Sequence, residues 1–190
     1  MKKLFFAAIA FVSLSAFTIA ASTWTNDDPH TQVGFEVTHL GINTISGAFT
    51  DVDITIEASK KDFSDAVFNF TAKSASIDTR VEARNNHLKS ADFFDVEKYP
   101  TLTFKSTSVK TAGKNKLKIT GNLTMHGVTK KVTLDALNRG TTVNPMNNKE
   151  TQGFQITGTV KRSDFNLGEK FPAPMISDEV NIEVNAEFAQ

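Results

Sequence analysis

The chain has 190 residues, no cysteine, and 21 basic side chains against 21 acidic ones. Its length suits a single domain with a sizeable core. The neutral charge balance argues against a nucleic-acid-binding protein, which normally carries a basic excess. The absence of cysteine excludes disulfides, thiolate metal sites and a cysteine nucleophile.

The first 21 residues have the pattern of a secretory signal peptide. Two lysines precede an apolar run over residues 4–17, and small residues follow this run. The run is too short to span a bilayer. We expect cleavage after Ala20 or Ala21, a mature single domain over residues 22–190, and a periplasmic location. A secreted protein and an uncleaved membrane anchor are the alternatives.

Alternation of apolar and polar residues with a period of two dominates the rest of the chain. A change of parity predicts a bulge or bend near Thr50, and His126-Gly127 reads as a hairpin turn. About eight strands are predicted, at residues 33–37, 45–56, 68–70, 102–104, 117–125, 128–134, 154–160 and 180–188.

One segment, residues 79–88, has helical periodicity instead. It places Val81, Arg84 and Leu88 on one face, with Thr79 as the expected N-cap. The predicted fold class is therefore all-β: an eight-stranded antiparallel up-and-down barrel with one short helix at one mouth. A two-sheet sandwich is the alternative.

Glycines on the apolar parity of three strands favour the barrel. Gly47, Gly121 and Gly158 would permit sharp bending of the wall and leave interior space unfilled. An eight-stranded barrel is just wide enough to pack solid or to hold one small ligand.

Seven segments, in order along the mature chain, resemble the YceI-like family. They are DDPHT at 27–31, FEVTH at 35–39, RNNHLKSADFF at 84–94, YP at 99–100, FKST at 104–107, GNLTMHGVTK at 121–130 and RSDF at 162–165. The chain departs from the family pattern at Asn85, where the family usually has an aspartate after the arginine.

This resemblance implies a lipocalin-like, exported barrel that binds a polyisoprenoid or similar long-chain amphiphile for carriage, storage or sequestration. It implies no catalytic residues, no cofactor and no nucleic-acid partner. Transient membrane contact would accompany lipid exchange. Two other functions stay open: a non-catalytic, stress-related interaction module with a filled barrel, and an enzyme acting at the mouth, where His87, Ser90 and Asp92 lie close in sequence.

Apolar residues at the inward-facing positions of the alternating strands form the predicted lining. These side chains could simply fill the barrel, whereas the family resemblance implies an apolar channel, with Phe93 and Phe94 capping it or anchoring the helix. The predicted lining residues are Phe35, Phe49, Phe68, Phe70, Phe104, Ile119, Leu123, Val132, Phe154, Ile156, Ile182 and Val184.

Up-and-down connectivity gathers the polar motif residues at one mouth. The helical segment, taken with the residues after it as 79–95, should lie there with the His126-Gly127 turn and loop 161–177. Loops 57–65, 110–116 and 138–150 should lie at the opposite end. The predicted polar mouth consists of His39, Arg84, His87, His126, Lys130 and Arg162.

Two interpretations of these polar residues stay open. Lys130 could reach out to water and His39 could bond a backbone carbonyl, or both could contact a polar head group such as a phosphate or quinone oxygen. Three histidines at one mouth would also suit a metal ion or a pH response. Because they lack short ligand spacing, we predict no metal site.

Overall fold

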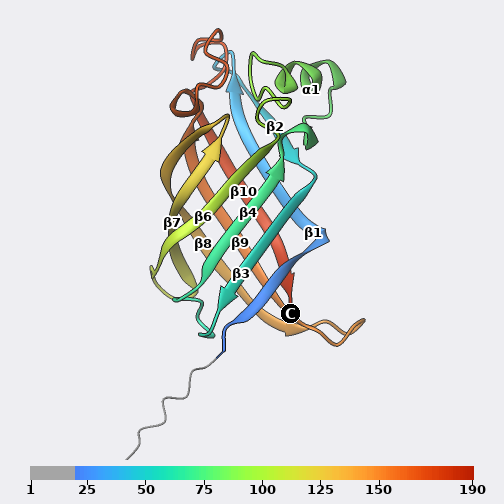
Figure 1. The fold of residues 1–190 in the computed structure, drawn as a ribbon, viewed down its shortest axis with the longest axis vertical. Coiled ribbons are helices and arrows are strands. Elements are labelled where there is room, and N and C mark those ends of the chain that lie inside the picture. Colours follow the sequence, from blue (N-terminus) through green and yellow to red (C-terminus); the bar gives the residue numbers. More distant parts are fainter. Residues whose placement is uncertain (1–19) are drawn as a thin grey trace, which may run out of the picture.

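The computed structural model describes residues 20–190, which form one closed antiparallel barrel (Figure 1). The predicted signal peptide lies outside the described residues, apart from its last two. The elements are β1 (Ser22–His39), β2 (Asn43–Phe49), β3 (Val52–Ala58), β4 (Val67–Lys73), η1 (Ser74–Ser76), β5 (Ile77–Asp78), α1 (Glu82–Lys89), β6 (Thr101–Thr111), β7 (Lys116–Met125), β8 (Val128–Val143), β9 (Glu150–Lys161), η2 (Arg162–Phe165) and β10 (Glu179–Ala189). No helix within residues 20–190 is long and apolar enough to cross a membrane.

Two members of the wall are strands broken in the middle. β2 pairs with the second half of β1 and β3 with its first half, with a bend at Thr50 and Asp51 between them. β5 continues the line of β4 and pairs with β2. Pairing of β10 with β1 closes the sheet. The eight-stranded barrel and the break near Thr50 are therefore confirmed, and the sandwich alternative is wrong.

The first strand begins at Ser22, well before the predicted start near residue 33. An irregularity between Asn26 and Thr31 lets the strand absorb the polar Asp27-Asp28-Pro29 sequence, which by itself reads as a loop. His30 lies in this irregularity, within the length of β1. A hydrogen bond with Asp27 (2.8 Å) raises the pKa of His30 above its ordinary value.

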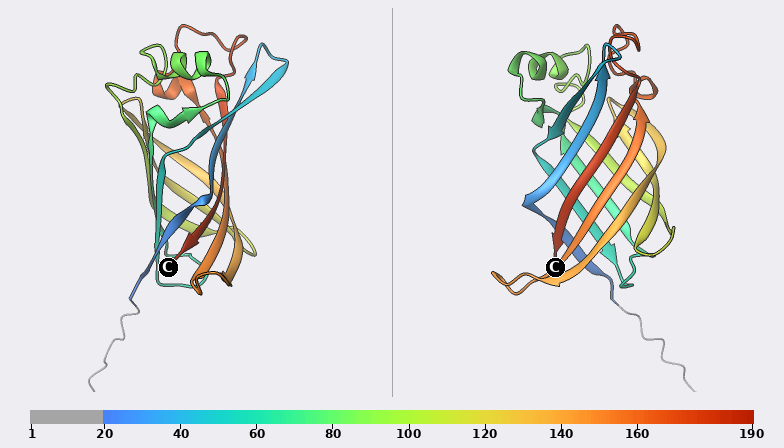
Figure 2. Two further views of the ribbon diagram at one scale, coloured as in Figure 1. Left: turned by 90° about the vertical axis from the view of Figure 1, so that its right-hand side faces the viewer. Right: turned by 180° about the vertical axis from the view of Figure 1, so that it is seen from behind.

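The two ends of the barrel differ as expected from the connectivity. α1, the loop after η2 and the β1–β2 turn gather at one end, which we call the mouth (Figures 1 and 2). The turns after β3, β6 and β8 lie at the opposite end. The helix begins later than predicted, because Val81 and not Thr79 occupies the N-cap position. Thr79 uses its hydroxyl instead to bond Arg84 and Asn85.

Aromatic side chains fill the half of the barrel away from the mouth. Phe154 stands at the centre of this cluster and contacts Phe63, Phe68 and Phe188, with ring centroids 5.2, 5.7 and 6.0 Å away. Trp24 packs on Phe63 at 5.9 Å. Edge-to-face pairs at these separations add to the burial of apolar surface. This end of the interior is therefore solid.

The inward glycines make room for neighbouring side chains rather than leaving open space, so that part of the prediction is wrong. A Cβ at Gly121 would lie against the Phe104 ring and 2.5 Å from the Lys105 carbonyl oxygen. A Cβ at Gly47 would meet Phe35, and one at Gly158 would meet Leu134. Each glycine lets a large side chain lie flat against the wall.

Gly121→Ala should therefore lower the free energy of unfolding by about 1–3 kcal/mol, the usual range for overpacking. The backbone carbonyl of Lys105 leaves the new methyl group nowhere to move. Gly34→Ala is the matched control, because its Cβ would have only ordinary contacts, 3.4 Å or more away. Urea denaturation measures both variants. Equal stability of the two would contradict this account of the glycines.

Candidate lipid-binding cavity

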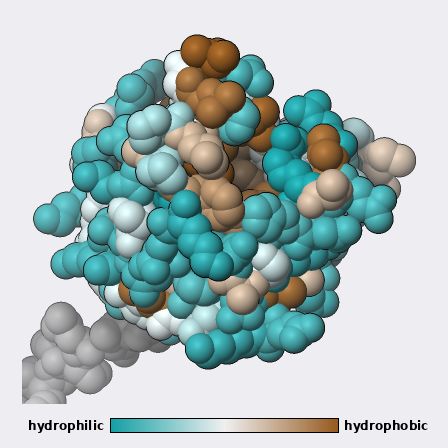
Figure 3. Space-filling view, turned by 90° about the horizontal axis from the view of Figure 1, so that it is seen from above, coloured by the Kyte–Doolittle hydropathy of each residue, from teal (hydrophilic) through white to brown (hydrophobic). Residues whose placement is uncertain are grey.

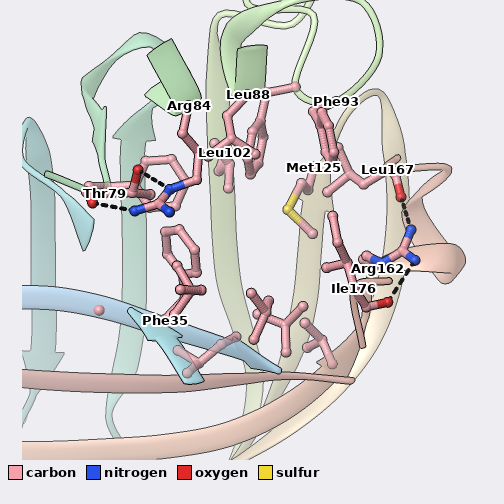
Figure 4. Close-up of a pocket in the computed structure, with 18 of the residues that line it drawn as sticks. Phe35, Thr79, Arg84, Leu88, Phe93, Leu102, Met125, Arg162, Leu167 and Ile176 are labelled. Carbon is pink, nitrogen blue, oxygen red and sulfur yellow. Dashed lines mark hydrogen bonds between the residues drawn. The ribbon is translucent and has the colours of Figure 1, made fainter. Parts of the chain in front are cut away.

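A cavity of about 410 Å³ occupies the half of the barrel next to the mouth (Figure 4). This volume lies within the roughly 300–1,000 Å³ of small-molecule sites. Its polar lining side chains are Thr79, Arg84, His39, His87 and Arg162. Most of the other lining side chains are aliphatic or aromatic and come from the barrel strands, from α1 and from the loop after η2.

Five of the twelve predicted apolar residues line this cavity: Phe35, Phe49, Phe70, Leu123 and Ile182. The other seven do not line it and instead belong to the packed core or pack against it: Phe68, Phe104, Ile119, Val132, Phe154, Ile156 and Val184. Strand parity fixes which face points inward. It does not fix how far from the mouth a residue lies, and the deeper side chains fill the barrel with one another.

Mouth segments supply lining residues that strand parity could not identify. Leu88, Phe93 and Phe94 come from the helical segment, and Phe171 and Ile176 come from the loop after η2. Phe94 also packs edge-to-face on Phe49 of β2, with ring centroids 5.6 Å apart. The only sequence signal for these residues was the motif that ends at Phe93-Phe94.

Arg84 is held at the cavity wall by one buried threonine. Its Nε donates to Thr79 Oγ1 (2.8 Å) and its Nη2 to the Thr79 carbonyl (2.7 Å). The side chain is half-buried, and within residues 20–190 no carboxylate lies in ion-pair distance of the guanidinium. The guanidinium therefore lines an apolar cavity with its charge unpaired by protein.

Asn85, where this chain departs from the family pattern, completes the same network. Its Oδ1 accepts bonds from the Thr79 N–H (2.8 Å) and hydroxyl (2.6 Å), and its Nδ2 donates to Asp78 Oδ1 (2.9 Å). Hydrogen bonds to Asp78 lower the pKa of its carboxyl group. The bond from the Arg80 N–H has the larger effect and the bond from the Asn85 side chain the smaller one. An aspartate at position 85 would set a second carboxylate against Asp78, whereas the amide both accepts and donates.

Arg162 lines the cavity but has no donor to spare for a ligand. Its guanidinium is buried and donates five hydrogen bonds to backbone carbonyls of the loop that follows it, those of Leu167, Gly168, Phe171, Ile176 and Ser177. Figure 4 shows it across the cavity from Arg84. Because these carbonyls fix the loop around one side chain, Arg162 positions the mouth.

An aromatic and ionic contact joins the helical segment to that loop. Phe93 stacks on Phe171 at 5.0 Å, and the His87 ring lies edge-on to both. Asp92 accepts from Lys170 Nζ (2.5 Å) and lies 3.4 Å from His87 Nε2. These partners, Lys170 foremost, lower the pKa of Asp92.

The remaining polar candidates lie at the edge of the mouth. Ser90 donates its hydroxyl proton to the His87 backbone carbonyl (2.7 Å), so it is not placed as a nucleophile against the imidazole. His126 packs on Tyr99 and lies 3.1 Å from the Phe165 carbonyl, outside the cavity lining. Lys130 is exposed and also outside the lining, whereas His39 is exposed and lines it. Among residues 20–190, the mouth histidines form no group with metal-binding spacing.

Arg162→Met should reduce the free energy of unfolding by about 2–4 kcal/mol, because five carbonyls lose a charged donor and not all can reach water. Arg162→Lys should recover only part of this, since an ammonium offers three donors. Urea unfolding of both variants against the parent measures the effect. Parent-like stability of Arg162→Met would contradict the role given to this side chain.

Comparison with known proteins agrees with this architecture. A UPF0312 protein of Staphylococcus aureus is 33% identical over 172 residues, covering 88% of this chain and 98% of its own. The crystal structure of the Campylobacter jejuni YceI protein is 34% identical and superposes with a TM-score of 0.72, covering 80% of this chain and 89% of its own.

A polyisoprenoid binding domain from Saccharophagus degradans shares only the fold. Its identity to this chain is 12% and its TM-score 0.65, over 89% of this chain and 98% of that one. The YceI-like domain profile matches residues 24–188. With the closed barrel, its cavity and these relatives in agreement, the chain belongs to the YceI-like family.

Proposed function

We propose that this protein binds one long-chain amphiphile, with the apolar tail in the cavity and the head group at the mouth. The observation that carries the proposal is the unfilled, mostly apolar half of the barrel, about 410 Å³ in volume. The Saccharophagus degradans domain with the same fold is a polyisoprenoid binding domain. A polyisoprenoid or similar tail is therefore the class of ligand that we assign.

The aromatic cluster around Phe154 gives the ligand an orientation. Because that cluster closes the far half of the interior, a tail can enter only from the mouth and must leave its head group there. The methylene groups contribute about 0.8 kcal/mol each when they leave water, so a twenty-carbon tail nominally gains about 16 kcal/mol. A tail that starts in a membrane gains far less, which suits reversible carriage.

Arg84 is the residue we assign to the head group. Its unpaired, half-buried guanidinium lines the cavity and carries donors beyond the two that Thr79 engages. Guanidinium groups form strong hydrogen bonds with phosphate and other oxygen acceptors. His39 and His87, which also line the cavity, are the secondary candidates. We do not assign Arg162, His126 or Lys130 to the head group. All donors of Arg162 bond backbone carbonyls, and His126 and Lys130 lie outside the cavity lining.

We further propose that the protein is exported, is periplasmic and has no enzymatic activity. The basic and apolar pattern of residues 1–21 supports export. The bonding of Ser90 to a backbone carbonyl supports a binding protein, since it turns the hydroxyl of Ser90 away from a nucleophile's role beside the His87–Asp92 pair.

Lipid extraction tests the proposed function directly. Protein purified from its own cells should release a long-chain amphiphile in stoichiometric amount, identified by mass spectrometry. Ile182→Trp should abolish this occupancy, because the indole would fill the cavity from β10. Thr159→Trp is the control, since Thr159 is exposed on the outer face of neighbouring β9. An empty parent, or equal occupancy of the two variants, would refute the proposal.

The head-group assignment has its own test. Arg84→Met should weaken binding of a prenyl phosphate about 10–100-fold, equivalent to one or two charge-assisted hydrogen bonds, and leave binding of the matching hydrocarbon unchanged. Arg84→Lys keeps the charge and should lose less. Competition against a fluorescent fatty probe measures each affinity. An equal loss for phosphate and hydrocarbon would show that Arg84 supports the wall only.

A further inference from the structure

Three exposed aliphatic side chains stand at one edge of the mouth. Ile42 and Leu40, in the turn between β1 and β2, are 86% and 55% exposed, and Met175, in the loop after η2, is 42% exposed. The β1–β2 hairpin projects from the barrel at this edge (Figure 2). Brown, apolar side chains border the hollow of the mouth in the view from above (Figure 3). We call Leu40, Ile42 and Met175 the rim patch.

Backbone hydrogen bonds hold the two segments of the rim patch together. The Leu40 N–H donates to the Met175 carbonyl (3.0 Å), and the Ser177 N–H donates to the Thr38 carbonyl (2.8 Å). His39 and Ile176 form a bridge between them. Leu40 has φ +51°, a conformation uncommon for a bulky side chain. These hydrogen bonds hold the two segments side by side, so the three apolar side chains of the rim patch form one surface.

No charged residue interrupts this edge. Residues 37–46 and 171–177 contain no Asp, Glu, Lys or Arg, in a chain of which 22% of residues are charged. The same segments also line the cavity, through Val37, Ile45, Ile176 and Met175 itself. A surface whose only titratable side chain is His39 thus runs from the rim patch to the cavity entrance.

We propose that the rim patch inserts into the surface of a lipid bilayer and sets the mouth against it. This inference rests on the proposed function, because a tail moving between bilayer and cavity would then avoid crossing water. Three side chains on turn tips fall far short of the ~800 Å² per partner of a specific protein interface. They suffice to reach the boundary between head groups and acyl chains. Because the edge is uncharged, docking should depend on neither anionic lipid nor salt.

Vesicle flotation tests the docking. The exported protein, its first residue determined by mass spectrometry, should float with phosphatidylcholine vesicles at both 0.1 M and about 1 M salt. Ile42→Asp should reduce the floated fraction at least tenfold. Leu40→Asn should also reduce it and preserve folding, since asparagine tolerates a positive φ. Met146→Asp is the matched control, because Met146 is 92% exposed in the turn after β8 at the opposite end.

Three results would overturn the docking proposal. An equal loss of vesicle flotation in Ile42→Asp and Met146→Asp would mean that the rim patch is not the membrane-binding surface. Docking that requires phosphatidylglycerol and disappears at high salt would mean that charge drives it. A dimer in sedimentation velocity that Ile42→Asp converts to a monomer would assign the patch to a second copy of the chain.

Binding of a water-soluble, short-chain prenyl alcohol without vesicles separates this proposal from the proposed function. Parent protein that binds the alcohol but does not float refutes docking and supports the cavity function. Parent protein that floats through the rim patch but does not bind the alcohol supports docking and refutes the cavity function.

Discussion

Pairing between the first and last strands is the constraint from which the rest of this structure follows. Once β10 pairs with β1, the barrel closes, and every inward side chain must find its contacts inside one narrow cylinder. Large aromatic side chains satisfy that requirement in the half away from the mouth, where Phe154 contacts three other rings. Toward the mouth, side chains from several strands, from α1 and from the loop after η2 line the wall, and the interior between them stays open.

The mouth depends on a second set of contacts, which the barrel does not supply. A buried guanidinium, Arg162, gathers five carbonyls and thereby shapes a loop with almost no regular structure. The stacked pair Phe93 and Phe171 then ties this loop to the helical segment. The two arginines of the cavity thus have opposite roles. One is consumed by its own backbone, whereas the other, Arg84, keeps charge and donors free toward the interior.

The proposed lipid carriage would set requirements that conflict with maximal stability. A cavity forfeits the packing contacts that would otherwise fill it, and an exposed aliphatic rim places apolar surface in water. The cavity and the rim patch both lie at the mouth end. The opposite half carries the solid aromatic core, which lets the half next to the mouth remain unfilled without loss of the fold.

The sequence by itself predicted most of the strands, the break near Thr50 and the end at which the motif-bearing loops converge, and it favoured a barrel over a sandwich. These features follow from local parity and connectivity, which act along the chain. The sequence did not reveal that β1 begins at Ser22, because the polar residues around His30 read as a loop, whereas a strand irregularity accommodates them within β1. Nor did it reveal that Thr79 bonds Arg84 rather than capping the helix.

Only the tertiary structure decided which inward residues enclose space and which fill it. Phe35 and Phe68 have the same parity signal, yet Phe35 lines the cavity and Phe68 lies in the core. Parity reports direction, whereas depth along the barrel and the neighbours met there depend on strand stagger and closure. The same holds for the polar mouth. Arg84 and Arg162 look alike in sequence, and only the positions of distant carbonyls determine that one is satisfied and the other is available.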